Sequence, residues 1–264
     1  MTTTPSERQR ILVQLHTLAV EDVVKLWRAA SAMDLESQAF RRLIEQAYPE
    51  IPSKWGTAAS EFAALWYDDA APNLTYRATP APLPPVERYT DNARWALGAI
   101  GEKALDRLVS DLQLSLFDMA RETIVGNVRM EPGSTWARYA SATACAFCRV
   151  MATRGAVYST EAAAVTVGAE RWEWWRNYQG RKRGGRIGRR GRVRGKQAAG
   201  DTYHPSCRCI AVEVRPGGSY EPPSYVSQWE KDYVAASRAV APGAGAGDLN
   251  SIVAHMRANS NATK

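Results

Sequence analysis

All four cysteines of this chain lie in two short clusters whose spacing is typical of metal ligands. Cys145 and Cys148 form a C-x-x-C pair, and His204, Cys207 and Cys209 form an H-x-x-C-x-C group further along the chain. Tetrahedral zinc takes four thiolate or imidazole ligands, and two short clusters brought together by the fold are a common way to supply them. The pattern therefore predicts a structural Zn2+ site whose four ligands come from these five residues.

The identity of the last ligands stays open at this point. Cys145 and Cys148 are the best-supported ligands. In one arrangement His204 binds the metal and one thiol stays outside the coordination shell. In the other arrangement all four cysteines bind and His204 orients them. The plainer alternative is that the cysteines are reduced thiols without a metal.

A catalytic cysteine is a competing interpretation. It makes Cys148 or Cys207 a nucleophile and His204 its base. A nucleophilic thiolate must be exposed, whereas thiolates that share a zinc ion are neutralised and sequestered. A zinc hydrolase has no better support, because the sequence contains no H-E-x-x-H motif and four protein ligands leave no open position for water. We therefore predict a structural site.

A strongly basic tract lies between the two ligand clusters. The whole chain carries a net charge of +7, but residues 176–196 alone hold ten basic residues and no acidic one, which leaves about −3 for the rest. The tract has too few apolar residues to build a core, so we expect a loop. Its positive charges predict non-specific, salt-sensitive contact with DNA phosphates, the alternative being a solvated loop. The predicted contact residues are Arg181, Lys182, Arg183, Arg186, Arg189, Arg190, Arg192, Arg194 and Lys196.

Four aromatic residues come directly before most of these charges. Trp172, Trp174, Trp175 and Tyr178 are possible stacking surfaces for bases. Trp172 and Trp175 would share one face if this segment were helical, and we expect those two side chains to belong to the core.

The helices that must position these clusters are visible as apolar periodicity. Apolar side chains that recur every three or four positions are typical of amphipathic helices. The pattern predicts helices over residues 6–32, 34–48, 53–69 and 105–124. Ser6 is the expected N-cap of the first helix, and the last is expected to end near Gly126. The proline-rich residues 81–88 indicate a linker, and residues 1–130 form a predominantly α-helical region.

The character of the chain changes after this helical region. Aromatic and β-branched residues predict short strands within residues 136–141, 155–160 and 209–216. We expect a small α+β module over residues 131–215 that holds the metal site. Residues 216–264 are predicted to contain a linker, short helices near 227–240 and 248–258, and a flexible polar tail. The predicted fold class is α+β.

Composition bounds the class of protein. An apolar fraction of 45% supports a sizeable core. The N-terminus lacks the apolar stretch of a signal peptide, and no run approaches the roughly 18 apolar residues of a membrane span. Clustered cysteines suit a reducing compartment better than a disulfide framework. We therefore expect a protein made in the cytoplasm of its cell.

The combination of motifs resembles a known phage family. Cys145 and Cys148 are followed by a Gly-x-x-Tyr element at Gly155 and Tyr158, and then by the group from His204 to Cys209. This order resembles the C-terminal half of the MuF-like head morphogenesis family of tailed phages, especially the minor head proteins encoded beside the portal gene in actinobacterial phages. The resemblance covers about residues 120–215, and the helical first half fits by its general character.

The resemblance implies a minor capsid protein present in few copies in the virion, in the capsid interior near the portal. Its implied partners are the portal protein, the major capsid protein or both, docked on the helical region, together with packaged double-stranded DNA. The principal rival is a capsid maturation protease, a common label in the same gene neighbourhood. The sequence offers that rival no convincing nucleophile and no open metal site.

Overall fold

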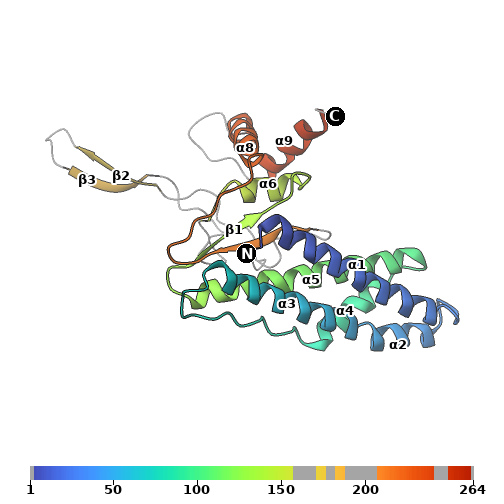
Figure 1. Cartoon of the computed structure of the whole chain (residues 1–264). Coiled ribbons are helices and arrows are strands. Elements are labelled where there is room, and N and C mark those ends of the chain that lie inside the picture. Colours follow the sequence, from blue (N-terminus) through green and yellow to red (C-terminus); the bar gives the residue numbers. More distant parts are fainter. Residues whose placement is uncertain (1–2, 157–170, 177–181, 188–206, 241–248, 263–264) are drawn as a thin grey trace.

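Apolar residues at helical spacing produce five helices in the first half of the chain. The computed structural model describes residues 3–156, 171–176, 182–187, 207–240 and 249–262. The five helices are α1 (Pro5–Ala30), α2 (Gln38–Ala47), α3 (Glu50–Ala70), α4 (Val86–Ala96) and α5 (Glu102–Met130). They pack side by side as a bundle (Figure 1). The prediction of a mainly helical region before residue 130 is confirmed.

Two predicted helix ends were wrong. The N-cap of α1 is Thr4, not Ser6, because Thr4 and Glu7 form a capping box in which each side chain accepts a hydrogen bond from the other's backbone N–H. Helix α5 continues through Gly126 to Met130. A glycine inside a helix costs only about 1 kcal/mol, and the extra turn buries Asn127 and Val128.

Two helices were not predicted. Helix α4 lies partly inside the expected linker, since Pro85 is its N-cap and proline is well tolerated where a helix begins. The short helix α6 (Ala146–Ala152) begins directly after Cys145. Residues 71–85 are irregular, and they include the first part of the predicted linker, residues 81–85. Asn127 and Thr123 of α5 accept hydrogen bonds from the backbone of Thr79 and Ala81.

Helix α5 is the central element of the bundle. Its buried face contacts α3 along small residues, among them Ala59 and Ala63, both fully buried. A Cβ added at Gly56 of α3 would lie 3.0 Å from the side chain of Met119, so a glycine is needed for this close approach. The core around α5 extends in one direction to α1 and α2 and in the other to a small sheet.

The sheet pairs strand β1 (Thr135–Tyr139) with strand β4 (Ile210–Val214) in antiparallel orientation. Both strands were predicted. Trp136, Ile210 and Val212 join the core of α1, α3 and α5, so the sheet is packed onto the bundle. The third predicted strand, within residues 155–160, falls mostly outside the described residues.

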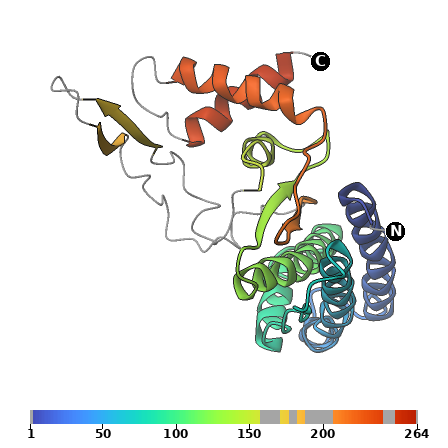
Figure 2. The ribbon, with the colours of Figure 1, turned by 60° about the vertical axis from the view of Figure 1, so that its left-hand side comes forward.

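Three helices cover the opposite side of the sheet. They are α6, α8 (Val226–Val240) and α9 (Leu249–Ala262), and they lie beyond β1 when seen from the bundle (Figure 2). Val150, Ala236, Ile252 and Met256 form their shared core. The helices predicted near residues 227–240 and 248–258 are confirmed. Among the described helices, none is both long and apolar enough to cross a membrane.

A separate two-stranded ribbon lies apart from the bundle and the sheet (Figure 1). Strand β2 (Arg171–Arg176) pairs with strand β3 (Lys182–Ile187) in antiparallel orientation. The helical arrangement considered for Trp172 and Trp175 was therefore wrong, and part of the expected basic loop is a strand. Aromatic residues favour strands, and backbone pairing can include the arginines and glycines of β3.

Candidate metal centre

The pairing of β1 with β4 brings the two cysteine clusters together. Tyr139 at the end of β1 lies opposite Ile210 at the start of β4. In an antiparallel pair, the chain that leaves one strand lies beside the chain that enters the other. The residues after β1 lead to α6, whose N-cap is Cys145. Cys207 and Cys209 directly precede β4, so both clusters reach the same end of the sheet.

Three of the four sulfur atoms form a compact buried group. The Sγ atoms of Cys148, Cys207 and Cys209 all lie within 4.8 Å of one another, and those of Cys148 and Cys207 are 3.4 Å apart. These residues are 1%, 2% and 4% exposed. Two sulfurs on one tetrahedral zinc are separated by roughly 3.8 Å, because each Zn–S bond is about 2.3 Å long. The spacing therefore suits a metal ion.

Cys145 lies at the edge of this group. It is partly buried and packs against the same cluster. None of the four cysteines, all of which are described, forms a disulfide. His204, the fifth predicted ligand, lies outside the described residues, so the structure brings together the four cysteines of the predicted set.

Hydrogen bonds within the group distribute the protons unevenly. Bonds with Cys145, Cys207 and Cys209 raise the pKa of the Cys148 thiol, whereas bonds from Cys148 and Cys209 lower the pKa of Cys207. These hydrogen bonds therefore favour the thiolate form of Cys207 over that of Cys148. A bound divalent cation would take the place of those protons, since metal-binding thiols are deprotonated.

Arg121 ties the second cysteine cluster to the bundle. Its guanidinium donates hydrogen bonds to the backbone oxygens of Cys209 at 2.8 Å and Cys207 at 2.9 Å, and to Asp118 at 2.7 Å. The residue is only 3% exposed. Sequence analysis missed this role; the available signal was a basic residue within the apolar stripe of α5.

Arg138 is a second buried arginine at the centre. It lies on β1, is 1% exposed, and directs Nη1 to 4.0 Å from the Sγ of Cys148. Its guanidinium carbon lies 5.8 Å from the centre of the Phe147 ring. Sequence analysis missed this residue too. The available signal was a charged residue in the middle of an otherwise apolar predicted strand.

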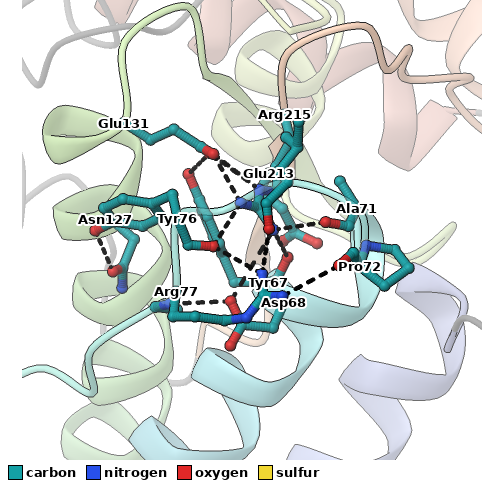
Figure 3. A network of polar contacts seen from close by, with 12 residues as sticks. Tyr67, Asp68, Ala71, Pro72, Tyr76, Arg77, Asn127, Glu131, Glu213 and Arg215 are labelled. Atoms are coloured by element: carbon teal, nitrogen blue, oxygen red, sulfur yellow. Dashed lines mark hydrogen bonds and ion pairs between the residues drawn. The ribbon is translucent and has the colours of Figure 1, made fainter.

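A different polar cluster holds the other end of β4 (Figure 3). Arg215 pairs at 2.7 Å with Glu131, the C-cap residue of α5, and donates to the backbone oxygens of Tyr67, Ala71 and Tyr76. The phenol of Tyr67 donates to Glu131 at 2.7 Å. Burial acts to raise the pKa of Glu131, but these hydrogen bonds outweigh it, and the pKa of Glu131 is lowered.

One further buried ion pair joins β4 to α1. Arg8 contacts both carboxylate oxygens of Glu213, at 2.7 and 2.9 Å. Burial raises the pKa of Glu213 in spite of this partner. The two ion pairs fix the strand to the bundle at its C-terminal half.

The predicted DNA-contacting residues are only partly described. Lys182, Arg183 and Arg186 lie on β3. The remaining members fall outside the described residues; they are Arg181, Arg189, Arg190, Arg192, Arg194 and Lys196.

The fold and the cysteine group define a mostly helical α+β protein with a small two-stranded sheet and a buried thiol centre at one end of it. The family model described as VG15 protein matches residues 2–236, which include both cysteine clusters and the whole bundle. The chain belongs to the VG15 family, a family of viral gene products, and this membership indicates a phage protein. Searches of curated proteins and of solved structures found no match.

Proposed function

We propose that this protein is a structural component of the head of a tailed phage, a minor capsid protein of the MuF-like kind located near the portal in the capsid interior. The observation that carries the proposal is the meeting of Cys148 with Cys207 and Cys209, with Cys145 packed against the same cluster, between the bundle and the helices α6 and α8. A closed metal site at such a position stabilises a fold. Membership of a phage family and the MuF-like order of motifs supply the biological setting.

The metal in this proposal is Zn2+. Thiolate ligands select soft or borderline metals, and zinc commonly has a structural role with four sulfur or nitrogen ligands. The burial of Cys148, Cys207 and Cys209 suits a closed site. The same burial is unfavourable for a nucleophile, which must reach a substrate. These observations favour a structural protein over a capsid maturation protease.

The second part of the proposal is contact with packaged double-stranded DNA. Residues 176–196 carry ten positive charges, and the ribbon of β2 and β3 presents part of this tract away from the bundle (Figure 1). Inside a head filled with DNA, such a tract meets a dense array of phosphates. Binding should be independent of sequence and should weaken steeply with salt. The helical region of residues 1–130 is proposed to dock on the portal protein, the major capsid protein or both.

One experiment separates the proposal from its rival. Purified protein is analysed for zinc, and its cognate capsid protein is incubated with the same sample. We expect about one tightly held zinc ion per chain, as for a single closed site, and no cleavage. Capsid cleavage that disappears on mutation of one cysteine without metal loss would instead establish the protease.

The location is tested in phage particles. We expect the protein in purified virions, in a copy number far below that of the major capsid protein, and cross-linked to a head protein. Its absence from virions, with heads that assemble normally when the gene is deleted, would contradict the structural role.

A further inference from the structure

If the thiol centre binds zinc as proposed, the residues around it indicate which side chains are the ligands. Four sulfur donors lie in the described part of the chain: three within 4.8 Å of one another, and Cys145 packed against the cluster that contains them. The pair frames the first turn of α6, with Cys145 as N-cap and Cys148 three residues later. The N-terminus of a helix favours negative charge, although α6 is too short to define a site by itself.

The charges around the sulfurs favour an anionic centre. Zn2+ with four thiolates carries a net charge of −2, whereas three thiolates and a neutral imidazole give −1. A buried negative centre is costly unless positive groups lie against it. Arg138 and Arg121 supply two buried guanidinium groups at this centre.

The two arginines have different relations to the sulfurs. Arg121 reaches the backbone oxygens of Cys207 and Cys209 and shares its charge with Asp118. Arg138 directs its guanidinium at the sulfur of Cys148 itself. A fully buried guanidinium beside a thiol gains little from a neutral S–H group, but it forms a charge-assisted hydrogen bond with a metal-bound thiolate.

We propose that the zinc ion is held by Cys145, Cys148, Cys207 and Cys209, with His204 outside the ligand set, and that Arg138 is the positioning counter-ion of this four-thiolate centre. Arg138 neutralises part of the excess negative charge and orients the Cys148 sulfur. Groups of this kind typically change metal affinity by about 10- to 100-fold. The proposal deepens the zinc site of the preceding section and rests on it.

The ligand set is tested by cobalt substitution in the full-length protein. Co2+ replaces Zn2+, and the sulfur-to-cobalt charge-transfer absorption reports the number of thiolates. In Cys145→Ser we expect this absorption to fall by about a quarter, because one of four thiolates is lost, and zinc to be held more weakly. In the matched variant His204→Ala we expect the charge-transfer absorption and the zinc affinity of the wild type.

The outcomes distinguish the two proposals. Wild-type protein that binds neither cobalt nor zinc would remove the metal site altogether. Wild-type protein that binds metal, with His204→Ala reducing the affinity and Cys145→Ser leaving the spectrum unchanged, would overturn only the four-cysteine ligand set.

The role of Arg138 is tested by Arg138→Gln and Arg138→Lys. We expect Arg138→Gln to lower zinc affinity by about 10- to 100-fold in competition with a chelator and to shift the cobalt charge-transfer band to longer wavelength, because a positive charge near the donor sulfur is lost. Arg138→Lys should restore part of both effects. An unshifted band together with unchanged affinity in Arg138→Gln would overturn the counter-ion role. If Arg138→Gln does not fold, the test rests on Arg138→Lys, whose cobalt band must still lie at longer wavelength than that of the wild type.

Discussion

Strand β4 is attached to the rest of the molecule in two chemically different ways. Its N-terminal end follows the thiol centre of Cys207 and Cys209, and its C-terminal end carries Glu213 and Arg215 in buried ion pairs. Under the proposed zinc site, the first attachment depends on a metal ion and the second on charged side chains. The two ends of this short sheet should therefore respond to different conditions: the thiol end to a chelator and the ionic end to acid.

The largest effect is expected from breaking the thiol end. Cys148→Ser should abolish metal binding, and structural zinc sites contribute on the order of 10 kcal/mol of apparent binding free energy. Hydrogen exchange should then show loss of protection in α6, α8 and α9, with the helices α1 to α5 retained. Treatment of the wild type with a chelator should reproduce this pattern and should change Cys148→Ser no further. Full metal content and normal melting in the variant would contradict the zinc centre.

Breaking the ion pair at the C-terminal end of β4 should cost less free energy of unfolding, and it should leave the thiol centre intact. Glu131→Gln removes the partner of Arg215, and loss of one member of a buried ion pair typically costs about 3–5 kcal/mol. Urea unfolding should report this loss while zinc content stays unchanged. The double variant Glu131→Gln with Arg215→Gln should recover part of the loss, and strictly additive effects would show that the two side chains do not interact.

Acid should weaken the ionic attachment of β4 through protonation of Glu131. Its pKa is lowered in the folded state, so its contribution to stability is present above the unfolded value of about 4.3 and is lost as pH falls through the lowered folded value. We expect the stability of Glu131→Gln to depend less on pH in this window, as measured by urea unfolding at several pH values. The burial of Glu213 opposes this trend, because a raised pKa favours the protonated folded form. Identical pH profiles for variant and wild type would exclude Glu131 as the titrating group.

The smallest expected effect concerns a single phenol. Tyr67→Phe removes the hydrogen bond to Glu131 but leaves its ion pair with Arg215, so a loss of about 1 kcal/mol is expected. Tyr76→Phe, whose phenol donates to Asn127 instead, is a matched control that should not alter the pH dependence attributed to Glu131. A loss in Tyr67→Phe as large as that of Glu131→Gln would mean that the phenol positions the whole ion pair.

The helices and the cysteine group could be predicted from the sequence, whereas the other contacts between distant residues could not. Apolar spacing identifies α1, α3 and α5, and ligand types identify the cysteine group. The buried partners Arg8 and Glu213 are 205 residues apart, and no local pattern links them. Arg121 and Arg138 stand out in the sequence only as charged residues within apolar patterns, and the cysteines that they contact could not be named from it. Helix α4 was missed because the prolines of residues 81–88 predicted a linker, whereas Pro85 is the N-cap of this helix.

The contact between Cys148 and Cys207 also determines how the length of the chain between them affects stability. These cysteines are 59 residues apart in the sequence, and their sulfur atoms lie 3.4 Å apart, so the chain between them starts and ends at the same place. The entropy of closing a flexible loop rises by only about 0.6 kcal/mol for each doubling of its length. We therefore expect changes in the length of the segment between the two cysteines to cost little stability, as long as both cysteines stay in place.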